Sequence, residues 1–206
     1  MLNPNKPTIA LTFDDDPVDN PNTAHEILDI LEAYHINATF FYCGSSINNS
    51  TVEKIKRSYL MGNEIGNHTM HYQDLTKLSD DDIRTEVEDA ARLLHNITHL
   101  THFLVRPPYL NYNENLLNII NEPLISASLD SKDCFGIQPH TIIHNVLSQV
   151  TDGSIVLMHE NQIHTVTALK TLIPSLLSAG YQITTVSNLM AQKNIILSKG
   201  RLYTHA

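Results

Sequence analysis

The sequence has few cysteines and few basic residues, and neither type forms a pattern. Two cysteines in 206 residues, Cys43 and Cys134, are too few for a disulfide scaffold, so each is expected as a small buried side chain, with pairing as the alternative. The 13 Lys and Arg residues stand against 22 acidic residues and leave a formal charge of −9. Because phosphate binding needs clustered cations, this balance argues against a nucleic-acid partner. The densest basic group, Lys54, Lys56 and Arg57, is expected on a solvated helix face.

Long apolar runs are also missing. No stretch approaches the length of a membrane span, and the start, MLNPNKP, lacks the basic-then-apolar pattern of a secretion signal. We therefore expect either a protein that stays inside the cell or a sequence that begins after a removed signal. No linker, low-complexity segment or shift in composition divides the chain, so we expect a single domain over residues 1–206, with a core over about 8–188. We also expect a monomer.

Short apolar segments alternate with amphipathic ones along the whole chain. Strands are predicted at residues 8–15, 38–44, 64–68, 103–109, 125–130, 154–160 and 181–187. Helices are predicted from a cap at Asn22 to Tyr34, at about 51–60, from a cap at Ser79 to His95, and near 114–121, 140–150 and 165–179. Pro174 is expected to kink or shorten the last helix.

This alternation predicts an α/β fold, and we expect a distorted (β/α) barrel of about seven parallel strands. An open doubly wound sheet is the alternative, but no glycine-rich phosphate loop follows the first strand. The barrel is favoured because ionisable residues fall at the carboxyl ends of different predicted strands: Asp14, Asp15, His68, Arg106, Asp130 and His159. In a barrel these ends meet on one face, so the sequence predicts one site there.

Five short motifs resemble those of the polysaccharide deacetylases, the NodB-homology or carbohydrate esterase family four, which includes chitin deacetylases. TFDDDP (12–17) is similar to TFDDGP, NHTMHY (67–72) to H-[ST]-x-x-H, RPPYL (106–110) to R-x-P-[YF]-G, DSKDC (130–134) to D-[SA]-x-D-W, and IVLMHE (155–160) to [IV]-L-x-H-D. The resemblance covers about residues 8–188. It implies a distorted (β/α) barrel that uses a divalent cation, of the zinc or cobalt type, to remove acetyl groups from N-acetylglucosamine polymers or xylan.

The resemblance also implies roles for residues of these motifs. Asp15 and His68 correspond to metal ligands, and Asp14 corresponds to the base that deprotonates a metal-bound water, whose pKa the cation lowers from about 15.7 toward about 7. Arg106 corresponds to the group that keeps Asp14 ionised and oriented. The backbone N–H of Tyr109 would face the developing oxyanion.

The proton donor comes from the last motif. His159 corresponds to the general acid that protonates the leaving amine, and Asp130 to the carboxylate that fixes its tautomer. Other interpretations stay open for single residues. Asp14 or Asp15 could cap the following turn, Arg106 and Asp130 could form an ordinary ion pair, and His159 could be a hydrogen-bonded core residue.

The second motif departs from the family pattern at a metal ligand. Tyr72 stands where the third ligand, a histidine, belongs, and a phenol with a pKa near 10 is a poor neutral ligand. His71 comes one residue early, so it would point away from the metal in an extended segment and could substitute in a helical one. Asp16 replaces a glycine and could add a ligand or face solvent. The metal site is therefore expected to be weak or absent.

Further departures affect the acetyl pocket that the resemblance implies. Leu110 replaces the glycine beside the oxyanion donor, and Cys134 replaces a tryptophan that walls the pocket; with Leu157 they are expected to contact substrate. Glu160 for aspartate is a milder change. We expect a family member that acts on or binds chitin-like N-acetylglucosamine polymers outside the cell or at the cell wall, with deacetylation weak or lost.

Two alternatives remain open. The first is an active N-deacetylase with an unusual ligand set in which His71 or Asp16 compensates for Tyr72. The second is a metal-independent hydrolase that uses Asp14 and His159, although amide hydrolysis without a Lewis acid loses several kcal/mol of transition-state stabilisation.

Overall fold

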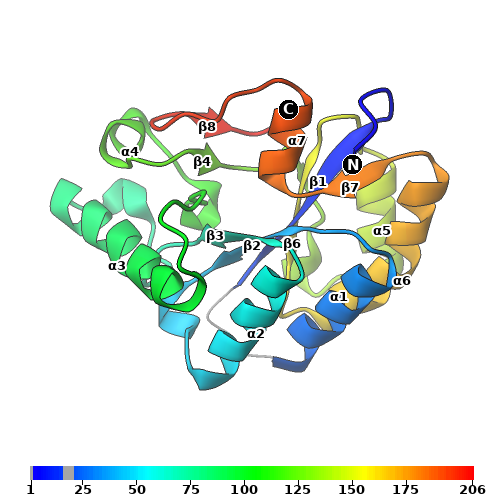
Figure 1. Ribbon diagram of the computed structural model, residues 1–206, viewed down its shortest axis with the longest axis horizontal. Helices are drawn as coiled ribbons and strands as arrows, with labels where there is room; N and C mark the ends of the chain where they lie inside the picture. The colour runs from blue at the N-terminus through cyan, green and yellow to red at the C-terminus, as the bar shows by residue number, and fades with distance from the viewer. Residues whose placement is uncertain (1, 16–20) are drawn as a thin grey trace.

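The computed structural model describes residues 2–15 and 21–206, so Asp16 lies outside the described residues. Its centre is a six-stranded parallel sheet with the order β3-β2-β1-β6-β5, in which β7 also pairs with β1 (Figure 1). The bounds are β1 Thr8–Asp14, β2 Thr39–Tyr42, β3 Glu64–Asn67, β5 Leu129–Asp130, β6 Ile155–His159 and β7 Gln182–Thr184. The parallel α/β fold predicted from the sequence is confirmed.

Strand pairing continues beyond β3 through one residue. Val105 bridges Asn67 on one side and Leu124 on the other, and Leu124 opens β4 (Leu124–Ile125), which pairs with β8 (Leu202–Tyr203). The strand predicted over 103–109 is therefore mostly wrong, because Pro107 and Pro108 have no N–H to donate to a ladder. Strand 125–130 is divided between β4 and β5, and β8 was not predicted. Among the described residues, no strand pairing joins β5 to β8, so strand hydrogen bonds do not close the barrel.

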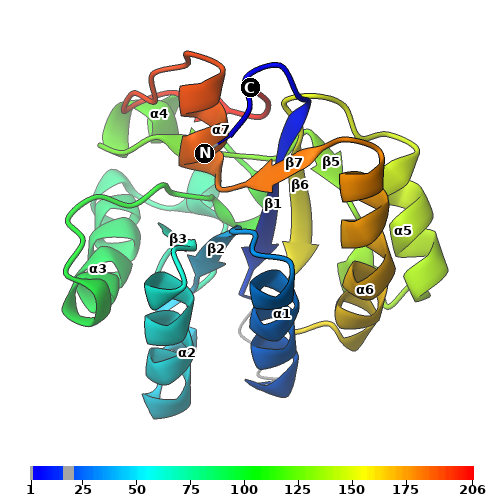
Figure 2. The ribbon, with the colours of Figure 1, turned by 45° about the vertical axis from the view of Figure 1, so that its right-hand side comes forward.

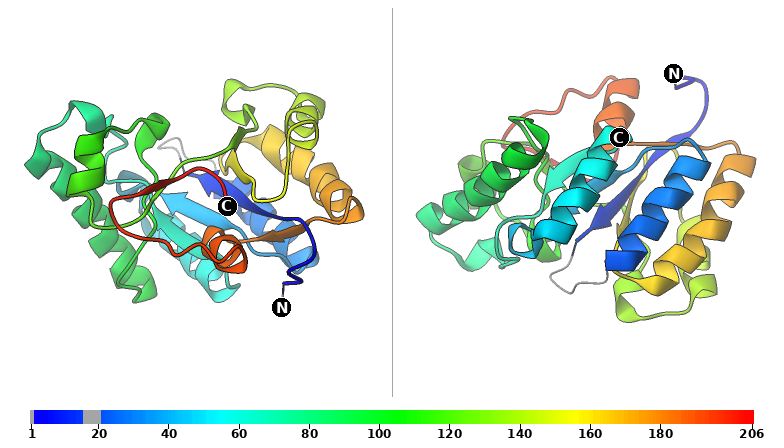
Figure 3. Two further views of the ribbon diagram at one scale, coloured as in Figure 1. Left: turned by 90° about the horizontal axis from the view of Figure 1, so that it is seen from above. Right: turned by 60° about the horizontal axis from the view of Figure 1, so that its bottom comes forward.

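Helices cover the outside of the strands in a fixed order. Contacts run from α5 to α6, α1, α2, α3 and α4, so that the helices follow the strands around the molecule (Figures 1, 2 and 3). Their bounds are α1 Pro21–Ala33, α2 Asn49–Leu60, α3 Asp80–Thr98, α4 Glu114–Ile119, α5 Pro139–Leu147, α6 Ile163–Ser178 and α7 Val186–Gln192. No helix in the described part of the chain has the length and apolar character to span a bilayer.

The predicted helix ends have mixed outcomes. Ser79 accepts a hydrogen bond from the backbone N–H of Asp82, which confirms it as the cap of α3. α1 already includes Pro21, so Asn22 lies inside this helix and its predicted capping role is wrong. α6 continues through Pro174 to Ser178, so Pro174 does not shorten the helix, and the predicted kink stays a prediction.

The side chains of β1 alternate between two environments. Ile9, Leu11 and Phe13 belong to the main core with residues of α1 and α6, whereas Ala10 packs in a second buried cluster with residues such as Phe41 and Ile155. Since successive side chains of a strand point to opposite faces, Asp14 shares the inner face with Ala10. The strand thus delivers a carboxylate to the inside of the molecule at its carboxyl end.

Candidate active site

Strand register brings Asp14 and His159 together. Asp14 pairs with His159 of β6 on one side and with Phe41 of β2 on the other, and both side chains of the Asp14–His159 pair are buried. Residues in register on adjacent parallel strands point to the same face, about 4.8 Å apart along the hydrogen-bonding direction. In Figure 2, β1 and β6 run side by side with their carboxyl ends toward the same edge. We call Asp14, Asp15, His68, Arg106 and His159 the strand-end site.

Arg106 is the centre of this site. Its side chain is fully buried, and its Nη1 donates to Asp14 Oδ1 and to Thr12 Oγ1, each at 2.7 Å. Its Nη2 and Nε donate to the carbonyls of Ser126 and Ile125 at 3.0 and 3.3 Å. Four of the five N–H groups of the guanidinium therefore have acceptors, and Asp14 has a buried positive partner. The Asp14–Arg106 geometry fits the predicted pairing, and the alternative ion pair between Arg106 and Asp130 is wrong.

A close approach at Gly66 supports the guanidinium. The Arg106 Cζ atom lies 4.1 Å from the centroid of the Phe41 ring, which is a stacked cation–π contact. A Cβ atom on Gly66 would lie 2.4 Å from that ring. Glycine at position 66 therefore leaves the space that the Phe41 ring needs beneath Arg106.

His68 follows β3 and is held in one orientation. Its Nδ1 lies 2.7 Å from the carbonyl oxygen of Arg106 and must donate, because a carbonyl only accepts. In the neutral ring this leaves Nε2 with its lone pair, 3.5 Å from Asp14 Oδ2. Asp15, the next residue after β1, is also buried. The ligand roles of Asp15 and His68 stay predictions, because the one group of three possible ligand residues in the described part of the chain does not include them.

The third ligand position does not suit a metal. The Tyr72 ring packs edge-on against the His68 ring, with centroids 5.1 Å apart, and against the Tyr109 ring at 5.0 Å. His71 turns away: its Nδ1 lies 2.6 Å from Glu86 Oε1, and its backbone N–H donates to Glu86 Oε2 at 2.8 Å. The alternative in which His71 replaces the missing ligand is not supported, because no group of three possible ligand residues in the described part of the chain includes His71. The described residues do not form the three-ligand cage of the family.

The carboxylate that bonds His159 is not the predicted one. Asp133 Oδ1, not Asp130, lies 2.7 Å from His159 Nδ1, and Asp133 Oδ2 accepts from the His159 backbone N–H at 2.7 Å. Thr165 Oγ1 donates to the same Oδ2 atom at 2.5 Å. Asp130 instead accepts from the Lys132 backbone and from Lys132 Nζ, at 2.8 and 2.7 Å. The predicted orienting role for Asp130 is thus wrong.

Chain geometry explains this exchange of aspartates. β5 ends at Asp130, and Lys132 then adopts a left-handed conformation with φ of 64°. That turn opens a short 3₁₀ segment, η4 (Asp133–Phe135), which places the fully buried Asp133 under His159. Because a carboxylate only accepts, His159 Nδ1 carries a proton in this pair.

Lys54 is a site residue that the sequence reading missed. It was expected on a solvated face, yet it is 6% exposed, and its ammonium pairs with Glu160 and lies 3.9 Å from Asp15 Oδ1. The helical spacing carried a signal, because the buried residues of α2 are Thr51, Lys54, Ile55 and Ser58. Lys54 therefore lies on the inward face and supplies a positive charge to two buried carboxylates.

Tyr42, the last residue of β2, lies beside Lys54 and its two carboxylate partners. The Lys54 Nζ atom lies 5.3 Å from the centroid of its ring. Burial raises the pKa of Tyr42 well above its ordinary value, and the nearby carboxylates of Glu160 and Asp15 raise it further. The raised pKa means that the phenol of Tyr42 is neutral at neutral pH.

The loop after Arg106 carries two strained residues. Tyr109 and Leu110 both have positive φ, of 59° and 56°, although neither is glycine. The left-handed conformation costs a non-glycine residue about 1–2 kcal/mol. The backbone N–H of Tyr109, the expected oxyanion donor, thus belongs to a loop whose backbone conformation is unfavourable for these residues. The Tyr109 side chain is 59% exposed.

We expect Leu110→Gly to raise the free energy of unfolding by about 0.5–1 kcal/mol, because the relief of backbone strain exceeds the added entropy of glycine in the unfolded chain. Chemical denaturation measures this difference. Leu78→Gly, at a position with φ of −95°, is the matched control and should destabilise the protein. A destabilised Leu110→Gly variant would mean that the Leu110 side chain contributes more than its strain removes.

Of the three predicted substrate-contacting residues, Leu157 lies on β6 and Cys134 lies in η4, whereas Leu110 ends the 3₁₀ turn Pro108–Leu110. Leu157 precedes His159 by two residues on β6, so its side chain shares the face of the strand-end site. Cys134 follows Asp133 and is exposed, so the expectation of a buried side chain is wrong for it, whereas Cys43 is buried; neither cysteine forms a disulfide. The Cys43–Cys134 pairing left open by the sequence is therefore not made.

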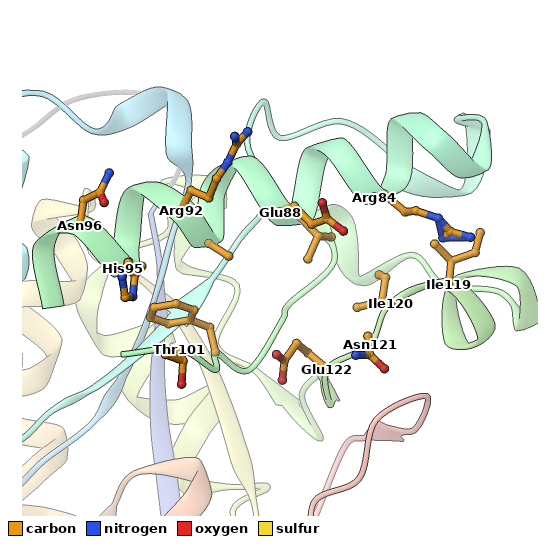
Figure 4. A pocket seen from close by; sticks show the side chains of 13 residues that line it. Arg84, Glu88, Arg92, His95, Asn96, Thr101, Ile119, Ile120, Asn121 and Glu122 are labelled. Carbon is orange, nitrogen blue, oxygen red and sulfur yellow. The ribbon is translucent and has the colours of Figure 1, made fainter. Parts of the chain in front are cut away.

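A cavity of about 820 Å³ lies elsewhere, on the flank of α3. Figure 4 shows residues of α3 such as Arg84, Glu88 and Arg92 on one side and Ile120 and Glu122 on the other. None of its lining residues belongs to the strand-end site. This cavity therefore plays no part in the chemistry considered below.

Comparison with known proteins gives consistent matches. The family model described as Polysaccharide deacetylase matches residues 2–125. The chain is 34% identical over 193 residues to a bifunctional xylanase/deacetylase of Pseudobutyrivibrio xylanivorans, covering 93% of this chain and 32% of that protein. It is 35% identical over 188 residues to the peptidoglycan-N-acetylmuramic acid deacetylase PdaC of Bacillus subtilis, covering 91% and 40%. The chain thus spans about a third to two fifths of the length of these relatives.

Solved structures match over nearly the whole chain. A family 4 acetyl xylan esterase from Clostridium thermocellum, in complex with a cobalt ion, superposes with a TM-score of 0.90 at 31% identity, covering 97% of this chain and 98% of that one. BA3943, a family pseudoenzyme from Bacillus anthracis, superposes with a TM-score of 0.84 at 25% identity, covering 98% and 71%.

Proposed function

Because the chain belongs to the polysaccharide deacetylase family, we propose that it binds an N-acetylglucosamine polymer over the strand-end site and that its metal-dependent deacetylation is weak or lost. One observation carries the proposal. Tyr72 occupies the third ligand position and packs on His68, while Glu86 holds the neighbouring His71 away. Asp15 and His68 alone leave a cation with two protein ligands where the family uses three.

Glycan binding is supported by exposed aromatic side chains on the loops at this edge. Tyr109 is 59% exposed and lies in the 3₁₀ turn Pro108–Leu110, and Phe135 is 71% exposed and lies in η4 after β5. Such rings combine an apolar face with low conformational freedom, which suits a sugar ring. Relatives are named for peptidoglycan, xylan and chitooligosaccharides, and we propose an extracellular or cell-wall location on the same grounds.

A working deacetylase is the second candidate, and a specific observation favours it. The Asp14–Arg106 and His159–Asp133 pairs are both complete and buried, so the base and the acid of the family each have their supporting group. Asp16, which lies outside the described residues, would have to complete the ligand set. Activity with a stoichiometric metal would favour this candidate.

The test combines metal content with acetate release. Protein purified without chelator should contain clearly less than one zinc or cobalt ion per chain. It should release acetate from N-acetylglucosamine oligomers more than about 100-fold more slowly than an active relative such as PdaC, even with added Zn²⁺ or Co²⁺, because several kcal/mol of Lewis-acid stabilisation are lost. Oligomer binding is measured separately by calorimetry. Stoichiometric metal with turnover would overturn the loss of activity, and an absence of binding would overturn the glycan proposal.

A further inference from the structure

A buried ammonium group lies beside the carboxylate that the family resemblance assigns as a metal ligand. The Nζ atom of Lys54 lies 3.9 Å from Asp15 Oδ1 and pairs with Glu160. All three side chains are buried. Two negative groups therefore meet a positive group that belongs to the chain itself.

The α2 helix fixes the ammonium in this place. Lys54 lies on the buried face of α2, next to the fully buried Ile55, and its Nζ atom is 5.3 Å from the centroid of the Tyr42 ring. Lys56 on the same helix is exposed and pairs only with the exposed Glu53 among the printed sequence neighbours on that face. The Lys54 ammonium is thus held between an aromatic ring and two carboxylates, unlike that of a surface lysine.

Glu160 depends on this ammonium for its counter-charge. Its Oε1 atom pairs with Lys54, while its buried Oε2 atom has no hydrogen-bond partner within the part of the chain that the structure describes. A buried carboxylate that loses its cation is costly to the fold. The Lys54–Glu160 pair therefore joins α2 to the end of β6 and keeps the ammonium beside Asp15.

A metal ion on Asp15 would have the ammonium as a close neighbour. Zinc bonds a carboxylate oxygen at about 2.0–2.2 Å, so an ion on Asp15 Oδ1 would lie no more than about 6 Å from Lys54 Nζ. Like charges at such a separation repel strongly in a buried site, because little water screens them. The residues present therefore do not fit a divalent metal, and this obstacle is separate from Tyr72.

We propose that Lys54 supplies the cation for Asp15 and thereby keeps divalent metals from binding there. The inference rests on the proposed loss of metal-dependent deacetylation and gives that loss a second cause. An ammonium group can neutralise a carboxylate, but it has no coordination site at which to activate water or a carbonyl group. Lys54 thus preserves the charge balance of the site without the chemistry of a Lewis acid.

The test compares dissociation constants for Zn²⁺, measured by competition against a chromophoric chelator on the full chain. Lys54→Met should bind Zn²⁺ at least about 10-fold more tightly than the parent, because a like charge beside the ion is removed. Lys54→Arg keeps the charge and should show no gain. Lys56→Met is the matched control: it makes the same change in net charge on the same helix, so it should also show no gain.

Two further variants locate the effect and guard against a failure to fold. Lys54→Met combined with Glu160→Gln removes both charges of the buried pair, which proteins tolerate better than a single unpaired charge, and it should show the same gain. Adding Asp15→Asn should abolish the gain, which places the ion at Asp15. Unchanged zinc affinity in either Lys54→Met variant that circular dichroism shows to be folded would overturn the proposal.

The outcomes separate this inference from the proposed function. Weak zinc binding in the parent without a gain in Lys54→Met would overturn the role of Lys54 and leave the proposed function standing. A gain in zinc affinity in a protein that binds no N-acetylglucosamine oligomer in calorimetry would do the reverse for the glycan proposal. Tight, stoichiometric zinc in the parent would overturn both the weak metal site and the role of Lys54.

Discussion

Arg106→Met is expected to lower the free energy of unfolding by about 3–5 kcal/mol, because removal of one partner leaves the buried carboxylate of Asp14 without its counter-charge. The carbonyls of Ile125 and Ser126 lose their side-chain donor in the same variant. Methionine keeps much of the length of arginine and limits the cavity that forms. Urea denaturation followed by circular dichroism measures the difference, provided that the dependence on denaturant is unchanged.

Arg57→Met is the matched control on the same protein. Arg57 also pairs with two carboxylates, Asp29 and Glu32, but these are 65% and 64% exposed. Exposed ion pairs contribute less than about 1 kcal/mol, so this variant should be close to the parent. Equal losses in the two variants would contradict the burial and pairing of Arg106 described here.

Tyr72→His is expected to increase the affinity for Zn²⁺ by at least about 10–100-fold, because it adds a third ligand to Asp15 and His68. The loss of a residue that only supports a ligand already lowers metal affinity by about 10–100-fold, so the gain of a ligand should have at least that effect. His68 is already prepared, because the Arg106 carbonyl fixes the proton on Nδ1 and leaves Nε2 for the ion. Competition against a chromophoric chelator measures the dissociation constants of parent and variant.

Two controls make this result specific. Tyr72→Phe keeps the ring packing against His68 and Tyr109 but adds no ligand, so it should leave the affinity unchanged. His71→Gln should also have no effect, because His71 is bonded to Glu86 and not directed toward Asp15. A loss of binding in His71→Gln would mean that the loop rearranges around a metal.

The general position of the site could be predicted from the sequence. Parallel strands align their carboxyl ends, so ionisable residues that end successive strands must meet, and the pairing of Asp14 with His159 in register follows from that rule. The pairing of Arg106 with Asp14 came instead from the resemblance of the motifs to those of the family. Only the common position of the strand ends depends on the periodicity of the strands and on which residues end them.

The errors arise where the chain leaves regular structure. Asp130 and Asp133 both stand in one motif, and only the left-handed turn at Lys132 decides which one reaches His159. The direction of His71 depends on Glu86, which is distant in sequence and belongs to α3. A strand of two residues such as β8 has no periodicity, so it could not be found from the pattern.

The ammonium group of Lys54 supplies two buried carboxylates with a counter-charge that is part of the chain. Stabilisation by a dissolved ion grows with the concentration of that ion, whereas a charge carried by the chain itself is present whenever the chain folds. Asp15 and Glu160 therefore keep a neutralising neighbour in surroundings that are poor in zinc or rich in competing chelators. These two carboxylates therefore need no bound cation as a counter-charge.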